Sequence, residues 1–171
     1  MEFKSPFRKK AFLSECLRQL LRASRKLMLK MLLQKKISWG RDFSIGKDFD
    51  IRPPLSAVFG NRVGIGKNIT IECNVSVGDD VLISSNVAFV GNDHRFDDPT
   101  LTVYAQGRHP DATVVLEGDN LIGFGVILVG PVKVGRGCIV GAGSVVVKDL
   151  PPNSICAGVP AKFIRQRHAS E

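Results

Sequence analysis

Residues 59–88 read FGNRVG-IGKNIT-IECNVS-VGDDVL-ISSNVA, five consecutive hexads that each begin with an aliphatic or aromatic residue. An α-helix repeats about every 3.6 residues and a β-strand about every 2, so neither explains this period. A parallel β-helix explains it, because each hexad forms one short wall and three walls close one coil. We expect the leading residues to stack inside the coils; they are Phe59, Ile65, Ile71, Val77, Ile83 and Phe89, and then Leu116, Ile122, Leu128, Val134, Val140 and Val146. The fifth residue of most hexads is also small or aliphatic: Val63, Ile69, Val75, Val81 and Val87, then Val126, Val132, Cys138 and Ser144.

Glycine often follows the leading residue of a hexad. The positions are Gly60, Gly66, Gly78, Gly123, Gly135 and Gly141. Because glycine adopts a positive φ without steric cost, we expect these residues to form the tight corners between walls.

The repeat is interrupted between Phe89 and Leu116. These two leading residues are 27 positions apart, which is not a multiple of six, so part of residues 90–115 must leave the β-helix as an external loop. Residues 91–99, GNDHRFDDP, are polar and typical of turns. Long excursions from a regular scaffold are usually either functional or disordered.

The loop contains His94 and His109, two of the three histidines in the chain. His94 stands where the chain leaves the last regular coil, and a neutral imidazole there can act as a general base near pH 7. The alternative is a histidine that only hydrogen-bonds to the loop backbone. The third histidine, His168, belongs to residues 168–171, which we expect to form a short tail.

The net charge of +8 is concentrated at the N-terminus. Residues 1–41 hold 12 Lys/Arg and 2 Asp/Glu, a net charge of +10, whereas residues 42–171 hold 12 and 14, a net charge of −2. Within the basic part, residues 12–36 predict an amphipathic helix. Its apolar stripe contains Phe12, Leu13, Cys16, Leu17, Leu20, Leu21, Leu27, Met28, Met31 and Leu32, and the opposite face contains Arg18, Arg22, Arg25 and Lys26.

The chain therefore divides into a basic helical segment, residues 1–41, and a repeat domain, residues 42–167. The helix either caps the end of the solenoid or a neighbouring subunit, which we favour, or attaches to an anionic membrane surface. Nucleic-acid binding is not expected, because no aromatic platform or recognised motif accompanies the charge.

The sequence also bears on the cellular compartment. No apolar run approaches the roughly 20 residues needed to span a bilayer. The N-terminus, MEFK, lacks a signal-peptide core and cleavage site, so we expect a cytoplasmic protein, at most peripheral at the inner membrane face. The four cysteines, Cys16, Cys73, Cys138 and Cys156, show no CxxC pairing, which favours buried free thiols over zinc ligands or disulfides.

Two further motifs close the sequence: residues 140–153, VGAGSVVVKDLPPN, and residues 157–165, AGVPAKFIR. Together with the hexads and the His94 loop, they resemble the hexapeptide-repeat acyltransferases, in particular the sugar O-acetyltransferases of the galactoside and maltose type. The C-terminal part, with Gly107-Arg108-His109-Pro110, is also similar to serine acetyltransferase. The resemblance implies a left-handed parallel β-helix, a homotrimer with active sites between subunits, and direct transfer from acetyl-CoA without an acyl-enzyme.

Carried over to this sequence, the resemblance implies that His94 takes the proton from the acceptor hydroxyl. The implied CoA-binding positions are Phe124, Ala142, Val147 and Lys148, with Lys162 and Arg165 at the CoA phosphates. The acceptor-site candidates are Asn92, Asp93 and His109. Galactoside-type enzymes carry an acceptor-binding Asn where this chain has Gly64, and the nearest substitutes are Asn61 and Asn68.

We therefore expect an acetyl-CoA-dependent O-acetyltransferase that acts on the sugar hydroxyl of a small-molecule or lipid-linked acceptor, in surface polysaccharide or lipopolysaccharide biosynthesis. N-acetylation of an amino sugar or an antibiotic is the alternative within the same class, and a non-catalytic scaffold is a more distant one. No metal is expected: zinc hydratases of the γ-carbonic anhydrase type, built on the same β-helix, need three imidazoles, and residues 42–167 hold only His94 and His109.

Overall fold

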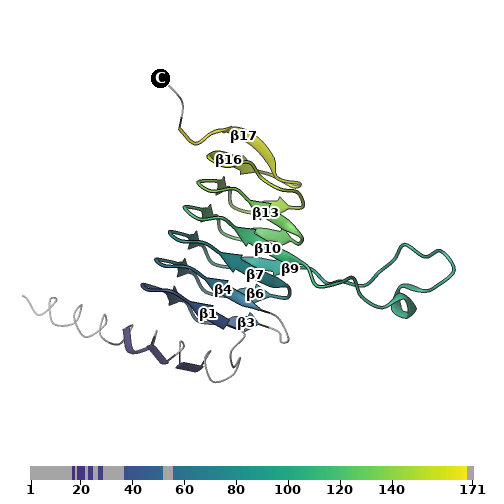
Figure 1. The fold of residues 1–171 in the computed structure, drawn as a ribbon, viewed down its shortest axis with the longest axis horizontal. Helices are drawn as coiled ribbons and strands as arrows, with labels where there is room; N and C mark the ends of the chain where they lie inside the picture. Colours follow the sequence, from purple (N-terminus) through teal and green to yellow (C-terminus); the bar gives the residue numbers. More distant parts are fainter. Residues whose placement is uncertain are drawn as a thin grey trace, which may run out of the picture.

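The computed structural model describes residues 37–51 and 56–168, together with residues 17, 19–21, 23–24 and 27–28, which are helical. The first two ranges form a parallel β-helix whose coils rise from the N-terminal to the C-terminal end (Figure 1). Its strands are β1 (Ile37–Trp39), β2 (Ser44–Ile45), β3 (Phe49–Ile51), β4 (Ala57–Phe59), β5 (Gly64–Ile65), β6 (Ile69–Ile71), β7 (Asn74–Val77), β8 (Leu82–Ile83), β9 (Ala88–Val90), β10 (Thr113–Leu116), β11 (Leu121–Ile122), β12 (Ile127–Val129), β13 (Val132–Val134), β14 (Ile139–Val140), β15 (Val145–Val146), β16 (Ser154–Ala157) and β17 (Lys162–Gln166). They form three sheets, in the orders β1-β4-β7-β10-β13, β17-β16-β14-β11-β8-β5-β2 and β15-β12-β9-β6-β3.

In the regular coils, neighbouring strands pair in parallel at a separation of 18 positions, as in Phe59 with Val77 and Leu116 with Val134, whereas the first coil pairs with the second at 20. Val77 pairs with Leu116, 39 positions away instead of 18, so 21 extra residues lie between these two partners. These residues leave after β9, return at β10, and project from the side of the solenoid (Figure 1). The predicted external loop is confirmed, and we call residues 91–112 the excursion. Within the excursion, the structure describes one element of regular secondary structure, the 3₁₀ turn η2 (Val103–Gln106).

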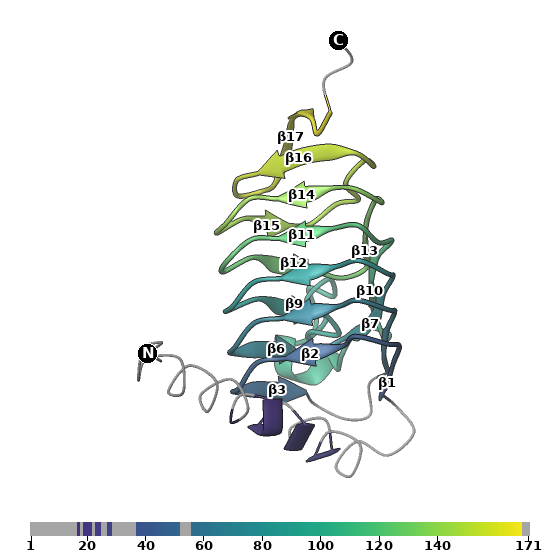
Figure 2. The same ribbon diagram turned by 90° about the vertical axis from the view of Figure 1, so that its left-hand side faces the viewer.

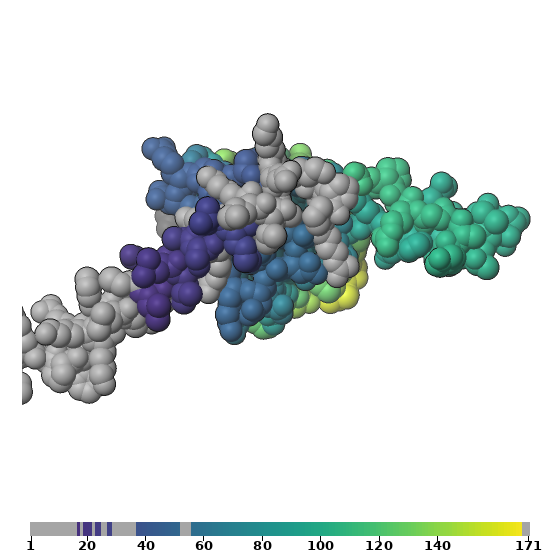
Figure 3. Space-filling view, turned by 90° about the horizontal axis from the view of Figure 1, so that it is seen from below, coloured from purple at the N-terminus to yellow at the C-terminus, as the bar shows by residue number. Residues whose placement is uncertain are grey.

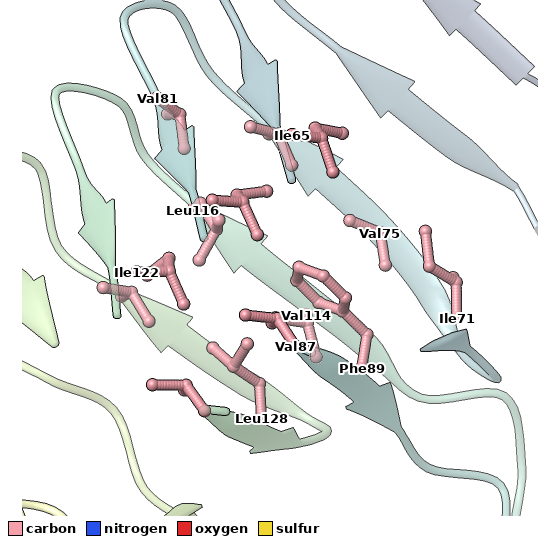
Figure 4. Packing of buried hydrophobic residues seen from close by; sticks show 14 of the residues in the cluster. Ile65, Ile71, Val75, Val81, Val87, Phe89, Val114, Leu116, Ile122 and Leu128 are labelled. Atoms are coloured by element: carbon pink, nitrogen blue, oxygen red, sulfur yellow. The ribbon is translucent and has the colours of Figure 1, made fainter. Parts of the chain in front are cut away.

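The core consists of the residues that the hexads place inside. All twelve leading residues are buried, and so are the nine fifth-position residues, including Cys138 and Ser144. Phe89, Leu116, Ile122 and Leu128 meet their counterparts from other coils across the interior (Figure 4). Apolar burial contributes about 25 cal/mol per Å², so this continuous column is the main stabilising feature of the stack.

The glycines after the leading residues do not have the positive φ that we predicted. Among the described residues, positive φ occurs later in the corners, at other glycines (Gly118, Gly125, Gly137 and Gly143) and at nine non-glycine residues: Asp42, Asp48, Arg62, Asn68, Asp80, Asn86, Asn92, Asp119 and Asn153. Asn and Asp tolerate this conformation because their short polar side chains hydrogen-bond locally. Gly66 and Gly123 are needed for another reason, because a Cβ at either position would lie 2.6 Å from a backbone nitrogen of the next coil.

Three of the cysteines are buried free thiols, as predicted: Cys73, Cys138 and Cys156. Burial raises the pKa of the Cys73 thiol to about 11, because ionisation inside the core would leave a charge without water. Cys16 lies outside the described residues.

The two ends of the stack are closed differently. In the first coil Trp39 stacks on Phe43, with 5.2 Å between ring centroids, and Phe43 packs against Phe59 of the second coil. At the other end β17 pairs with β16 in antiparallel orientation, so the chain folds back on the last coil (Figure 2). The repeat begins at Ile37, inside the segment that we assigned to residues 1–41.

The N-terminal helix is described at eight positions, and the rest of the expected helix over residues 12–36 lies outside the described residues. All eight positions are exposed in the single chain, so these residues bury no apolar face on the first coil, and packing on a neighbouring subunit stays a prediction. In the described part of the chain, no helix combines the length and apolar character needed to cross a membrane.

Candidate active site

The excursion is closed at its base by Asn92. The backbone of Asn92 has a φ of 58°, and its side-chain oxygen accepts a hydrogen bond from the Ala112 amide, where the chain re-enters the stack. Its Nδ2 donates to Asp111 Oδ1 at 3.0 Å, and Arg108 Nη1 donates to the Asn92 carbonyl at 3.1 Å. Asn92 therefore joins the outgoing and returning strands, and we call these contacts the neck.

Beyond the neck the two strands of the excursion run side by side. His94 and Arg108 form an antiparallel bridge, the Arg95 amide donates to the Gly107 carbonyl at 2.9 Å, and the His109 amide donates to the Asp93 carbonyl at 2.9 Å. This short ribbon brings the two histidines to the same end of the excursion, although they are separated by fifteen positions in the sequence.

The far end of the excursion is held by its own side chains. Gln106 accepts a hydrogen bond from the Asp98 amide at 2.9 Å and donates to the carbonyls of Asp98 and Leu101. The Thr100 hydroxyl and amide both donate to the Asp98 carboxylate, and these bonds lower the pKa of Asp98. The tip thus has a defined conformation while exposing Phe96, Leu101, Val103 and Tyr104.

A pocket of about 800 Å³ lies between the neck and the side of the stack. One wall is Val129, Gly130 and Pro131, from the turn that follows β12. The other residues come from the excursion and its neck: Gly91, Asn92, Asp93, His94, Phe96, Val103, His109, Pro110, Asp111 and Ala112. The site residues predicted from the loop sequence therefore meet in one pocket, which is the right size for a small molecule.

The ring of His94 has an unpaired nitrogen. This atom, Nδ1, is buried and has no hydrogen-bond partner within the described chain. His94 itself lines the pocket. The alternative reading of His94, a ring that is hydrogen-bonded to loop backbone, is wrong for Nδ1. Imidazole at the edge of a pocket is a suitable general base.

The three acceptor-site candidates have different positions. Asp93 does not contact the His94 ring; its carboxylate accepts a hydrogen bond from the His94 amide at 2.7 Å. The amide side chain of Asn92 is engaged in the neck. The His109 ring lines the pocket and packs edge-on against Phe96, with 6.3 Å between ring centroids. Among the three, His109 has the side chain best placed to meet an acceptor.

The possible substitutes for the acceptor-binding Asn do not reach this pocket. Asn61 donates through its backbone and side chain to Asp79, and this pairing lowers the pKa of Asp79. Asn68 donates to Asn86 of the next coil at 3.1 Å. Both are corner residues that join neighbouring coils.

Val147 and Lys148 lie at the same corner of the stack as the pocket wall. β9, β12 and β15 are neighbours in one sheet, with Val90 paired to Val129 and Leu128 paired to Val146. The residues after β15 therefore follow the same line as Val129 and Gly130, one coil further on. They do not line the pocket of the single chain.

Phe124 and Ala142 lie at the opposite end of these strands. They occupy equivalent corners in consecutive coils, where the Gly143 amide donates to the Phe124 carbonyl at 2.8 Å. Phe124 is 54% exposed. Between the two corners, the outward side chains of β9, β12 and β15 are apolar, namely Ala88, Ile127 and Val145, whereas β6 and β3 continue the same row with Thr70 and Asp50.

Lys162 and Arg165 are on β17, paired with Ala157 and Ile155, and both are exposed. The segment before β17 passes over β15, where the Ala161 amide donates to the Val145 carbonyl at 2.8 Å. Phe124, Ala142, Val147 and Lys148 thus lie at the two edges of the β9–β12–β15 sheet face, Lys162 and Arg165 are on β17 of another sheet, and none of the six lines the pocket of the described chain. The described residues contain no cluster of three His, Cys, Asp or Glu side chains suited to a metal ion.

Sequence reasoning missed Asp111 and the role of Arg108, which complete the neck with Asn92. The available signal was an Asn, a residue that tolerates the left-handed backbone conformation, where the chain leaves the coil, together with the polar Asp111 where the chain returns to it. Neither residue type reveals such a contact by itself, because the two partners are separated by the whole excursion.

Comparison with known proteins places the chain among enzymes. A scan against family models finds no match. The chain is 32% identical over 152 residues to galactoside O-acetyltransferase of Lactococcus lactis subsp. lactis, covering 82% of this chain and 68% of that protein. The chain belongs to the hexapeptide-repeat acetyltransferase family. Galactoside O-acetyltransferase of Escherichia coli (strain K12) is 31% identical over 132 residues, which are 72% of this chain and 63% of that enzyme, so the chain spans under two thirds of this relative. A serine acetyltransferase of Buchnera aphidicola is 32% identical over 141 residues, covering 82% of this chain and 45% of that enzyme.

Solved structures of the hexapeptide-repeat family have the same fold. A hexapeptide-repeat-containing acetyltransferase from Vibrio cholerae matches with a TM-score of 0.60 and 26% identity, over 86% of this chain and 82% of that one. An N-acyltransferase from Bacillus cereus, in complex with dTDP and coenzyme A, matches with a TM-score of 0.57 and 25% identity, over 78% of this chain and 80% of that one. The predicted left-handed parallel β-helix is confirmed.

Proposed function

We propose that this chain is an acetyl-CoA-dependent O-acetyltransferase that acts on a sugar hydroxyl, with His94 as the general base. The observation that supports the proposal is the position of His94 at the pocket with Nδ1 buried and unpaired, and we propose Nε2 as the nitrogen that meets the acceptor. The similarity to galactoside O-acetyltransferases supports a hydroxyl on a sugar. Surface polysaccharide or lipopolysaccharide biosynthesis, in the cytoplasm where acetyl-CoA is available, is the setting that we propose.

In the proposed reaction, Nε2 of His94 accepts the hydroxyl proton as the acceptor oxygen attacks the thioester carbonyl. The carbon–sulfur bond of the tetrahedral intermediate then breaks, and the imidazolium returns the proton to the departing CoA thiolate. The products are the acetyl ester and free CoA. General base catalysis of this kind contributes about 10²–10⁴-fold to the rate.

Acetyl-CoA would lie along the outer face of the β9–β12–β15 sheet. The apolar face formed by Ala88, Ile127 and Val145 suits the pantetheine arm. Phe124 and Ala142 border it on one side, and Val147 and Lys148 on the other, beside the pocket. Lys162 and Arg165 supply positive charge for the CoA phosphates.

We further propose that the working enzyme is a homotrimer. A His94 whose Nε2 accepts a proton carries hydrogen on Nδ1, and a buried N–H without an acceptor is costly. A neighbouring subunit would supply that acceptor and would enclose the six CoA positions, which are open in one chain. Light scattering on the purified protein tests this proposal, and we expect a mass equal to that of three chains.

N-acylation of an amino sugar is the second candidate. It is favoured by the similar fold of the Bacillus cereus N-acyltransferase in complex with dTDP and coenzyme A. The same pocket and base would serve an amine, so the two candidates differ only in the acceptor.

The deciding experiment is thiol release from acetyl-CoA with panels of sugar and amino-sugar acceptors. We expect acceptor-dependent release in the wild type and a loss of about 10²–10⁴-fold in His94→Ala. His168→Ala is the matched control, because it removes an exposed histidine outside the pocket. Full activity in His94→Ala would refute the general base, and the absence of both release and CoA binding in the wild type would favour the scaffold.

A further inference from the structure

We propose that the N-terminal helix is a docking surface for an anionic lipid membrane. The observation behind this proposal is the exposure of its large apolar side chains. Leu17, Leu20, Leu21, Leu27 and Met28 are 58%, 68%, 45%, 61% and 45% exposed. Five exposed large apolar residues on one helix leave an apolar surface without a partner in the described chain.

These residues share one side of the helix. At about 100° per residue, Leu17, Leu20, Leu21, Leu27 and Met28 fall within an arc of about 120°, the width of an ordinary buried stripe. Ser24 lies inside the same arc, and its hydroxyl donates to the Leu21 carbonyl at 3.0 Å. Because this hydroxyl is already paired within the helix, its transfer into an apolar environment costs little.

The helix lies outside the β1–β3 end of the solenoid (Figures 1 and 2). Viewed from that end, its described residues are on the outer surface of the molecule (Figure 3). The excursion projects from the side of the stack, and β16–β17 are at the far end. A membrane in contact with the apolar face would therefore leave the pocket and the β9–β12–β15 sheet free.

The charge of the segment argues for lipid over the same segment of a second copy as the occupant. Residues 1–41 carry a net charge of +10, against −2 for the remaining residues. Packing this segment against its counterpart in a second copy would bring two strongly cationic segments together. An anionic bilayer instead neutralises the charge and accommodates the apolar side chains at the same time, as interfacial helices do.

The consequence for the enzyme rests on the proposed function. Docking would hold the enzyme beside the membrane, where a lipid-linked sugar is available as the acceptor. The docking itself requires no activity, so it is tested by binding alone and can fail or succeed independently of the acetyltransferase assignment.

The test is co-sedimentation of the full-length protein with vesicles of phosphatidylglycerol and phosphatidylcholine, and with vesicles of phosphatidylcholine alone. We expect binding to the anionic vesicles that falls with added salt, and at least tenfold weaker binding to the neutral ones. The double variant Leu20→Ser/Leu27→Ser should lose at least tenfold in affinity. The matched control is Leu101→Ser, which replaces a leucine of 50% exposure at the tip of the excursion.

A second variant separates charge from apolar contact. Arg22→Gln/Arg25→Gln should weaken binding to anionic vesicles and reduce its salt dependence, without changing the weak binding to neutral vesicles. The proposal is overturned if the wild type does not bind anionic vesicles, or if Leu20→Ser/Leu27→Ser binds them with the affinity of the wild type. A fall in oligomer mass in that variant, measured by light scattering without vesicles, would assign the face to a second copy and would also overturn the proposal.

Discussion

The coils and the excursion of this protein hold their side chains in opposite ways. In the coils inward residues stack on equivalent residues of the neighbouring coil, as Ile71 does through its pairing with Phe89, and every leading residue is buried. In the excursion Phe96 and Tyr104 are 71% and 90% exposed, and the chain is held by hydrogen bonds at the neck and the tip. Repetition thus supplies stability, while the part that escapes the repeat carries the histidines.

The difference in stability is the largest effect that we expect. Ile71→Ala should lower the free energy of unfolding by about 2–5 kcal/mol, because it opens a cavity in a column that cannot close. Leu101→Ala in the excursion should change it by no more than about 0.5 kcal/mol, since Leu101 is half exposed. Urea denaturation followed by circular dichroism measures both. Equal losses in the two variants would show that the excursion is part of the cooperative core.

The buried thiol of Cys73 should make the stability of the coils depend on pH. The pKa of Cys73 is raised from 9.0 to about 11 by burial, so the thiol stays protonated in the folded state while the unfolded chain ionises. Its stabilising contribution is therefore complete below pH 9 and declines between pH 9 and 11, by at most roughly 2–3 kcal/mol. The measurement is urea denaturation at pH 8, 9, 10 and 11, with Cys73→Ala compared with the wild type at each pH. Parallel pH profiles for the two proteins would contradict the assignment.

The hexads made the coils predictable from the sequence, because a period of six fixes which side chains face inward without any knowledge of distant contacts. The interruption of that period located the excursion, and His94 within it. The function of Gly66 was mispredicted, because a close approach between coils and a positive φ both favour glycine. The role of Asn92 was not predictable either, since Ala112 and Asp111 lie across the excursion and no local pattern connects them.

The neck gives the third prediction, on the proposed activity. Asn92→Ala should lower kcat about tenfold and leave KM for acetyl-CoA within about twofold, because loss of the neck misplaces His94 and leaves the CoA face intact. Its matched control is Asn86→Ala, which removes an asparagine of similar φ, 61° against 58°, from a regular corner. Steady-state thiol-release kinetics give both constants.

The same pair of variants can be compared without an activity assay. Limited proteolysis should cut the excursion faster in Asn92→Ala than in the wild type, since the two side-chain hydrogen bonds of Asn92 to the returning strand are lost. Asn86→Ala should be cut at the wild-type rate. Equal kcat in Asn92→Ala and the wild type, with faster cleavage, would show that the neck orders the excursion without positioning the catalytic ring.

The smallest effect on global stability that we predict compares two glycines that share a positive φ. Gly107 in the excursion and Gly125 in a coil have φ values of 74° and 69°, and a Cβ at either position would meet nothing within 4 Å. Alanine should therefore cost about 1 kcal/mol of backbone strain at Gly125, and roughly 1–3 kcal/mol at Gly107, whose ψ of −155° lies outside the left-handed helical region. In Gly125→Ala this cost should appear in global unfolding, because the coils unfold together. In Gly107→Ala it should appear only as faster hydrogen exchange near the His94–Arg108 bridge, because the excursion opens by itself. If Gly107→Ala also lowers the global stability by about 1 kcal/mol, the neck transmits strain into the stack, and the coils and the excursion are one cooperative unit.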